Sequence, residues 1–382
     1  MLHVDLQAQN AVTASSASHA HDNGGLKSLR LVNKAFCKAV TPLVFGSVAF
    51  FPESSKKVDM QVLMSIVNSD IAAHVKTLII RPMLSTSVDD QWAQCARFSH
   101  ALPVCFSKFR NLKTIRIDGD IFLGADKQMR KSHTLASLRR SFVKAVHNAL
   151  FKASPENLTG LELDFPVLEG FFEAFSGQNI LDQFSGTLSR LERLSVTVKY
   201  RNVQASRGTS PSQRHDYPDL QYQDRFWTLI GLATNLRSLK IHCNNVLDLD
   251  NAPISSLRRI ERLDLSRVRC HTETLVALCN TVKVIRLSEV RLITGIWADV
   301  FVRLKDVPTL MEFDARSLTY DAPSPHFARI LHPLNACLEV PRRDDCEAFQ
   351  ELNKVLGMRQ CGRNSYGPFS DPWMSKSITL PN

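Results

Sequence analysis

A short apolar pattern recurs along the middle of this chain. Its form is hydrophobic-x-x-hydrophobic-x-hydrophobic, and copies begin at residues 75, 112, 158, 191, 236, 260, 282 and 310. Each copy ends in the alternation of apolar and other positions that is typical of a β-strand with one buried face. The last copy is the weakest, because Phe313 and Ala315 replace its second and third aliphatic residues. The pattern therefore predicts a series of short, similar strands.

Runs with helical spacing separate several of these strands. Apolar residues three or four positions apart predict helices at 58–69, 137–153, 167–176, 225–233 and 272–280. A strand followed by a helix, many times over, is expected of a solenoid in which each unit buries its apolar face against its neighbours. The predicted fold class is therefore α/β, an irregular solenoid of about eight strand–helix units over residues 51–320. The alternative is an ordinary α/β domain in which strands happen to precede helices.

A helical run with a strand-like tail precedes the repeats, at residues 26–50. Its apolar residues recur every three or four positions and share one face of the predicted helix: Leu26, Leu29, Val32, Phe36 and Val40. Pro42 is expected to end this helix, because its ring cannot continue a regular one. Val48 and Phe50 then alternate with small residues, as in a strand.

The remaining segments are low in apolar content or outside the repeats. Residues 1–25 are rich in Ala, Ser, His and Gly and are predicted to be disordered, because too little of the segment can be buried to offset the entropy of ordering it. Residues 201–224 are predicted to form a loop inserted into the solenoid. Residues 321–382 are predicted to contain two closing helices, at 324–340 and 344–359, and an irregular tail.

Composition limits the broad class of protein. A hydrophobic content of 44% and a charged content of 22% are those of a globular protein. No apolar run reaches the ~20 residues that would span a membrane, and no secretory signal is evident. The nine cysteines include no C-x-x-C pair, so neither a zinc site nor a disulfide frame is expected. An intracellular location, cytoplasmic or nuclear, is expected.

The net charge of +10 raises the possibility of nucleic-acid binding. Within the predicted strands, however, the residues that alternate with the buried ones are mixed in sign, which does not make the continuous basic track that a nucleic acid would need. A mixed-charge surface suits a protein partner, whose complementary charges set register and specificity. The predicted partner contacts are Arg193, Lys240, Arg262 and Arg286. The alternative is a solvated face without a partner.

An enzymatic role is not expected. The sequence contains no G-x-S-x-G, P-loop, H-E-x-x-H or G-x-G-x-x-G motif. His242–Cys243 and Cys270–His271 are adjacent pairs, but neighbouring residues on a strand point to opposite faces and cannot simply form one Cys–His site. No catalytic residue, cofactor or metal is predicted.

The sequence of residues 26–50 also resembles that of a known family. LRLVNKAF followed by TPLVFGSVAF resembles the C-terminal half of the F-box of many fungal proteins, and the later repeats resemble the degenerate leucine-rich repeats that often follow it. The resemblance implies that the helix packs against the adaptor subunit of cullin–RING ubiquitin ligases. The docking residues it implies are Leu29, Val32, Phe36, Val40, Pro42 and Leu43. The Leu-Pro-x-Glu/Asp segment that opens an F-box has no counterpart in residues 1–25, so either the box has degenerated or the chain starts inside it.

The sequence thus leads to two functional hypotheses. The first is a non-catalytic substrate-recognition subunit of an SCF-type ubiquitin ligase, which binds an unknown protein substrate on the strand face of its repeats. The second is a leucine-rich-repeat interaction scaffold without ligase association, in which the F-box-like segment serves only as the N-terminal cap.

Overall fold

The structure is a computed structural model of the 382-residue chain. It describes residues 34–50, 58–81, 88–118, 133–164, 185–198, 220–320, 330–331, 337–338 and 342–364. The predicted disordered segment at 1–25, the predicted helix at 167–176 and most of the predicted loop at 201–224 lie outside these residues.

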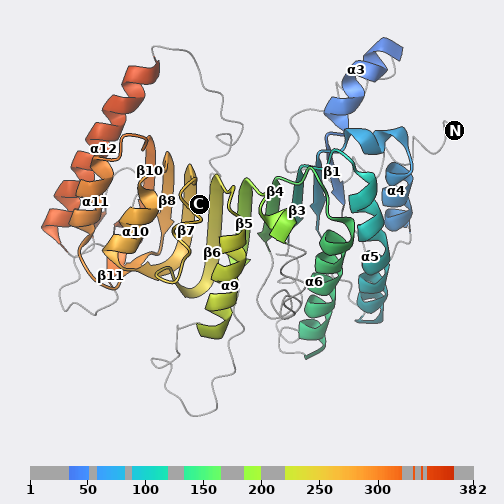
Figure 1. The fold of residues 1–382 in the computed structure, drawn as a ribbon, viewed down its shortest axis with the longest axis horizontal. Helices are drawn as coiled ribbons and strands as arrows, with labels where there is room; N and C mark the ends of the chain where they lie inside the picture. The colour runs from blue at the N-terminus through green and yellow to red at the C-terminus, as the bar shows by residue number, and fades with distance from the viewer. Residues whose placement is uncertain are drawn as a thin grey trace.

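One parallel sheet runs the length of the molecule (Figure 1). Every copy of the apolar pattern forms a strand in it, as predicted, and the strands formed by consecutive copies are neighbours in the sheet. The main strands, in order, are β1 (Ser47–Phe50), β2 (Thr77–Ile80), β3 (Thr114–Asp118), β4 (Gly160–Asp164), β5 (Arg193–Val198), β6 (Ser238–Asp248), β7 (Arg262–Cys270), β8 (Val284–Ser288) and β10 (Glu312–Arg316). This order is that of a leucine-rich-repeat solenoid, and the predicted fold class is confirmed.

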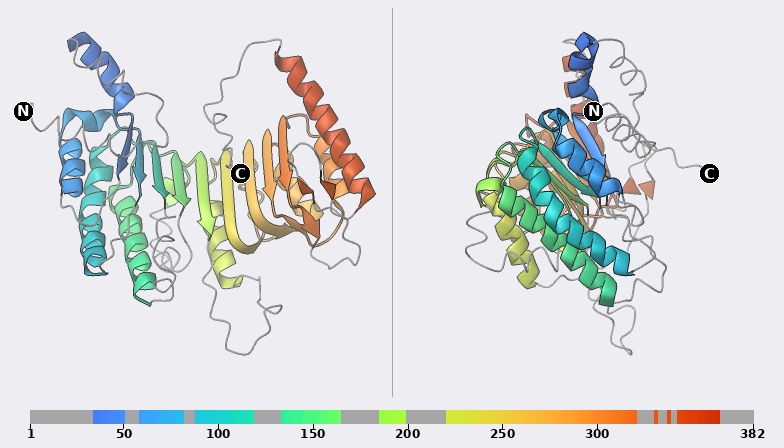
Figure 2. Two further views of the ribbon diagram at one scale, coloured as in Figure 1. Left: turned by 180° about the vertical axis from the view of Figure 1, so that it is seen from behind. Right: turned by 90° about the vertical axis from the view of Figure 1, so that its right-hand side faces the viewer.

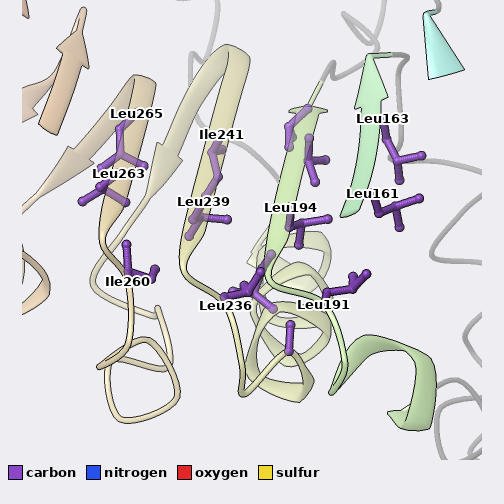
Figure 3. Packing of buried hydrophobic residues seen from close by; sticks show 14 of the residues in the cluster. Leu161, Leu163, Leu191, Leu194, Leu236, Leu239, Ile241, Ile260, Leu263 and Leu265 are labelled. Carbon is purple, nitrogen blue, oxygen red and sulfur yellow. The ribbon is translucent and has the colours of Figure 1, made fainter. Parts of the chain in front are cut away.

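The apolar positions of the repeats form a continuous core. In all eight copies the three positions are buried, and none of them is more than 8% exposed. Figure 3 shows how Leu161, Leu194, Leu239 and Leu263, from four consecutive strands, lie side by side in this layer. Burying an aliphatic side chain of this size stabilises a fold by about 1.5–3 kcal/mol. The repeated pattern is therefore what holds successive units together.

Helices cover the apolar side of the sheet (Figures 1 and 2). They are α4 (Val58–Val67), α5 (Val88–Lys108), α6 (His133–Ala153), α9 (Leu220–Leu232), α10 (Thr272–Cys279) and α11 (Trp297–Lys305). Their aromatic residues enter the same core, where the Phe98 ring meets those of Phe50 and Phe142 edge-on at centroid distances of 5.8 and 5.4 Å. Edge-on contacts of this kind are favourable for aromatic rings.

Several of the helix predictions need correction. The sequence pattern missed α5 and α11, and α6 begins four residues before the predicted start at 137. In α5 the burial of Phe98, Leu102 and Phe106, four residues apart, is regular, but Pro103 stands inside the helix. The predicted loop at 201–224 is also wrong at its end, because α9 already begins at Leu220.

The last units contain a corner that the strand pattern did not predict. Arg267, Glu289 and Ser317 follow the first ladder of β7, β8 and β10 at equivalent positions, with left-handed φ values of 58°, 54° and 51°. After each corner an apolar residue is buried, and the chain then enters a second parallel ladder that includes β9 (Arg291–Leu292) and β11 (Thr319–Tyr320). Each of these units thus has two strand segments.

The segment that resembles an F-box joins the sheet directly. Its helix α3 (Lys34–Val44) continues two residues beyond Pro42, so the expected end of the helix is wrong. The hydrogen bond that Pro42 cannot make is offset by burial of Val44 and Phe45, which pack with Val40 and Ile71. The strand-like tail is confirmed as β1, which pairs in parallel with β2.

A long helix, α12 (Arg343–Asn364), covers the last unit, and the second predicted closing helix is confirmed. The Phe349 ring contacts those of Phe301 and Phe313 at 5.3 and 6.0 Å. The first predicted closing helix, at 324–340, is wrong. Its described residues are the antiparallel strands β12 (Ile330–Leu331) and β13 (Cys337–Leu338), and the intervening Pro333 has no N–H to offer a helix.

The N-terminal end of α12 is also fixed by a buried carboxylate. Asp345 accepts a hydrogen bond from the Ala298 backbone N–H at 2.7 Å and one from the Tyr320 hydroxyl at 2.7 Å. The same hydroxyl accepts from the Trp297 N–H at 3.0 Å. Two N–H groups at the start of α11, which have no partner within that helix, are thereby satisfied.

Candidate functional site

The candidate site is the sheet surface opposite the buried repeats, called here the strand face. Its residues alternate with the buried ones, and the parallel register aligns them in three columns across β2, β3, β4, β5, β6, β7, β8 and β10. The first column is Thr77, Thr114, Gly160, Arg193, Ser238, Arg262, Val284 and Glu312. The second is Ile79, Arg116, Glu162, Ser195, Lys240, Asp264, Arg286 and Asp314. The third is Arg81, Asp118, Asp164, Thr197, His242, Ser266, Ser288 and Arg316.

On β2 to β4 the charges of the strand face are paired with one another. Asp118 accepts hydrogen bonds from Arg81 at 2.5 Å and from Arg116 at 2.6 Å, and Arg116 also lies 3.9 Å from Glu162. Burial lowers the pKa of Arg116, but the hydrogen bond and charge of Asp118 outweigh this effect and raise it overall. Since Asp118 is buried between two cations, this part of the face is internally neutralised.

Two further hydrogen bonds tie β5 into this network. The Arg193 guanidinium passes over Gly160 of β4 and donates to the Thr114 hydroxyl of β3 at 2.8 Å. The Thr197 hydroxyl donates to Asp164 of β4 at 2.6 Å. The polar side chains of this region are therefore engaged within the protein.

On β6 to β10 the cations are more exposed, and the lengths of their ion pairs vary. Lys240 lies 3.9 Å from Asp264, and their side chains are 56% and 27% exposed. Arg286 donates to Glu312 at 2.7 Å, with exposures of 42% and 25%. The Glu312 hydrogen bond raises the pKa of Arg286, which stays charged. Arg316 is 62% exposed. Because each cation reaches further into solvent than its carboxylate, a partner would meet the cations first.

The four predicted partner contacts lie on adjacent strands of this one face. Lys240 and Arg286 share the second column, and Arg193 and Arg262 share the first. The Arg193 guanidinium hydrogen-bonds across β4 to Thr114, and that of Arg286 hydrogen-bonds to Glu312 on the neighbouring strand. The role of all four in binding stays a prediction.

The predicted adaptor-docking residues are only partly within the described chain. Leu29 and Val32 lie outside it, as does the side chain of Phe36. Val40 is 6% exposed and packs within the chain, whereas Leu43 is 67% exposed; Pro42 is half-buried. Val40 therefore supports α3 from inside, whereas Leu43 is exposed, and the role of both in docking stays a prediction.

A row of hydrogen bonds at the edge of the strand face was missed from the sequence. Asn111, Asn157 and Asn235 each precede the first leucine of their unit. Their amide groups donate to carbonyls of the preceding unit, on Ala73, Arg110 and Ser189, at 2.7, 2.8 and 2.7 Å. In the preceding unit, the accepting carbonyl always belongs to the residue just before the position that is equivalent to the asparagine. The recurring Asn-Leu dipeptide was the signal that could have revealed this asparagine ladder.

The cysteines and histidines that might suggest chemistry are held in structural contacts. Burial raises the pKa of the Cys105 and Cys279 thiols to about 12, which disfavours the reactive thiolate. Cys243 is buried while its neighbour His242 is exposed, so the two do not share a face. Asp250 accepts from the His271 backbone N–H at 3.0 Å and from the Thr274 hydroxyl at 2.5 Å, and so holds the start of α10 in place.

The described residues contain neither a metal-binding cluster nor a membrane-spanning helix. No group of three or more His, Cys, Asp and Glu residues there could hold a metal ion. In that same part of the chain, no helix is long and apolar enough to cross a bilayer.

Comparisons with known proteins add little to this picture. No protein-family model matches the chain, and no curated protein sequence matches it. Among solved structures, it is similar to an internalin (inlF) from Listeria monocytogenes, with 10% identity and a TM-score of 0.31 over 78% of this chain and 69% of that one. It is also similar to the Rad7 and Elc1 complex in yeast, with 13% identity and a TM-score of 0.33 over 83% and 82%. These likenesses are distant, and the fold assignment rests on the strand order and the buried repeats.

Proposed function

We propose that this chain is a non-catalytic substrate-recognition subunit of an SCF-type cullin–RING ubiquitin ligase. In this proposal α3 contacts the adaptor subunit, and the strand face binds the protein substrate. The chain itself supplies binding and positioning, and transfer of ubiquitin is left to other subunits.

The observation that carries the proposal is the way the F-box-like segment is built into the repeats. Phe45 and Gly46 alone separate α3 from β1, and the Gly46 carbonyl accepts from the N–H groups of Lys76 and Thr77, both at 2.9 Å. The segment is thus an integral first unit with one buried side, formed by Val40 and Val44, and an exposed Leu43. An exposed apolar side chain on a helix that packs against the rest of the chain is suited to contact with another protein.

The strand face supports the second half of the proposal. Its columns carry both signs of charge in a fixed register, which favours a partner with a complementary arrangement of charges. A solenoid presents such side chains on a surface that its core holds rigid.

A direct binding measurement tests the adaptor contact. The purified adaptor subunit of SCF ligases would be titrated into the wild-type chain and into Leu43→Asp. The matched control is Met358→Asp, which changes another exposed apolar side chain at the far end of the solenoid. We expect wild type and Met358→Asp to bind equally and Leu43→Asp to lose at least about tenfold in affinity, since a buried charge would replace an apolar contact. Absence of binding by the wild-type chain would remove the ligase role.

The second candidate is an interaction scaffold without ligase association. The pairing of β1 with β2 favours it, because that pairing gives the F-box-like segment a structural role as the N-terminal cap. This candidate predicts that the adaptor does not bind, whereas partners of the strand face do.

A further inference from the structure

The strand face divides into two parts that differ in the state of their cations. On β2 to β5 the guanidiniums of Arg81, Arg116 and Arg193 each donate a short hydrogen bond to another residue of the strand face. On the neighbouring strands β6, β7, β8 and β10 lie three cations, called here the cationic patch: Lys240, Arg286 and Arg316. Their side chains are 56%, 42% and 62% exposed, against 26% and 34% for Arg81 and Arg116, so the second part presents the more exposed cations to a partner.

The ion pairs within the patch are exposed, and two of the three are long. Lys240 and Asp264 are 3.9 Å apart, and Arg316 and Asp314 are 3.4 Å apart, both beyond the length of a strong charge-assisted hydrogen bond. Arg286 directs two of its N–H groups at a single oxygen of Glu312, at 3.2 and 2.7 Å. Exposed pairs of this kind contribute little to stability, so a partner's carboxylates can compete for these cations at low cost.

The register sets the spacing of the patch. Lys240 and Arg286 stand in the same column two strands apart, which corresponds to about 9–10 Å. Arg316 lies on the next strand and in the next column. In an extended peptide, side chains on one side recur about every 6.6–7 Å, so carboxylates at alternate positions can reach successive cations.

We propose that the cationic patch binds an extended, acidic segment of a protein partner, with carboxylates at alternating positions. The inference rests on the proposed function, in which the strand face binds the substrate, and it specifies the class of ligand that this face recognises. A neutral peptide fits less well, because it would cover the cations without satisfying them.

A nucleic acid fits the patch poorly. Asp264, Glu312 and Asp314 interrupt the cations and would repel a continuous phosphate backbone. None of the residues in the three columns is Phe, Tyr or Trp, and His242 is the one aromatic ring among them, so these columns offer no row of rings on which successive bases could stack. Because carboxylates separate the cations of the patch, a ligand whose negative charges are separated by neutral residues fits better than one with a continuous row of them.

Binding of synthetic peptides tests the proposal. A short fluorescein-labelled peptide in which aspartate alternates with serine would be titrated into the full chain, with fluorescence anisotropy as the readout. We expect the Lys240→Gln/Arg286→Gln double variant to bind it about tenfold more weakly, a loss that corresponds to two exposed charge contacts. The double variant Arg303→Gln/Arg343→Gln removes the same charge from exposed positions on α11 and α12 and should bind like wild type.

Two further ligands separate spacing and polymer class from charge alone. A peptide of the same composition with its aspartates in one block should bind more weakly than the alternating one. Equal binding of both peptides, equal loss in both double variants, or no binding of the alternating peptide would each overturn the inference. So would a single-stranded oligothymidylate that binds as tightly and depends on the same two residues.

Adaptor binding through Leu43 is a separate readout. If the adaptor binds and the peptide does not, this inference fails while the ligase role stands. If the peptide binds and the adaptor does not, the ligase role fails and the patch remains a recognition site.

Discussion

Arg193 on β5 donates a hydrogen bond to Thr114 on β3, although the whole of β4 lies between them. The contact is possible because β4 has Gly160 at the crossing point, where no side chain obstructs the guanidinium. One arginine thus links three strands. Its predicted role as a partner contact has to be weighed against this internal one.

A side chain at residue 160 should break that link. A Cβ there would lie 3.1 Å from the Thr114 Oγ1 and 3.2 Å from an Arg193 terminal nitrogen, and the further methyl groups of valine would displace the arginine. We expect Gly160→Val to lower the free energy of unfolding by about 1–2 kcal/mol, through the lost hydrogen bond and local crowding. Urea unfolding would measure it, and the loss should shrink when Thr114→Val has already removed the acceptor. A full loss in that background would contradict the mechanism.

Gly357 supplies the control for this substitution. It lies on the exposed side of α12, and nothing is within 4 Å of its added Cβ. Gly357→Ala should therefore raise the free energy of unfolding by about 0.5–1 kcal/mol, since alanine favours a helix more than glycine does.

The asparagine ladder should stabilise the repeats through its side-chain amides. We expect Asn157→Ala to cost about 0.5–1.5 kcal/mol, the net value of one hydrogen bond. Asn157→Asp should cost more at neutral pH, because a carboxylate would face the Arg110 carbonyl that the amide group now contacts at 2.8 Å. Chemical denaturation of the two variants checks the order, and an aspartate variant as stable as wild type would argue against the ladder.

Asp345 should make stability depend on pH. Burial raises the pKa of its carboxyl in the folded state, although the Tyr320 and Ala298 hydrogen bonds oppose the rise. The folded state then binds the proton more tightly than the unfolded state, so this contribution is present at low pH and declines as the pH rises through the folded-state pKa. The stability of wild type relative to Asp345→Asn should therefore fall from about pH 4 towards neutrality. Unfolding at a series of pH values tests this, and a difference that rises with pH would refute it.

The C-terminal cap should depend on Phe349. Its side chain is 3% exposed and contacts two aromatic rings of the last unit. We expect Phe349→Ala to lower the free energy of unfolding by about 3–5 kcal/mol through the cavity it leaves. Met358→Ala, at an exposed position of the same helix, should change it by less than about 0.5 kcal/mol. A loss below about 1 kcal/mol for Phe349→Ala would mean that α12 does not seal the solenoid.

The strands and their register were accessible from the sequence because each copy repeats the same burial at the same spacing. Val75, Leu78 and Ile80 are buried for the same reason as Leu236, Leu239 and Ile241, so one pattern identified distant segments of the chain. The columns of the strand face followed from the alternation of side chains along each strand.

Other features depend on contacts that a local pattern does not contain. The alternation of side chains predicts that Arg193 points into solvent. Its guanidinium instead reaches Thr114, because Gly160 on the neighbouring strand has no side chain in the way. The continuation of α3 beyond Pro42 is decided by burial of Val44 and Phe45 against Ile71, far along the sequence. In the same way, the left-handed corners fall on Arg267 and Glu289, residue types without a preference for that conformation.

Because α3 leads directly into β1, the distance between α3 and the far end of the sheet is fixed. Because β1 is one strand of the same sheet as β10, a protein held at Leu43 and one held at Arg316 would be separated by the width of that sheet, roughly 40 Å at the usual spacing between strands. The hydrogen-bonded strands of the described sheet join the two contacts, so this distance would vary less than in proteins whose docking segment is attached by a linker. Adding or removing one repeat would then change the distance between the two bound proteins by the spacing of one strand, about 4.8 Å.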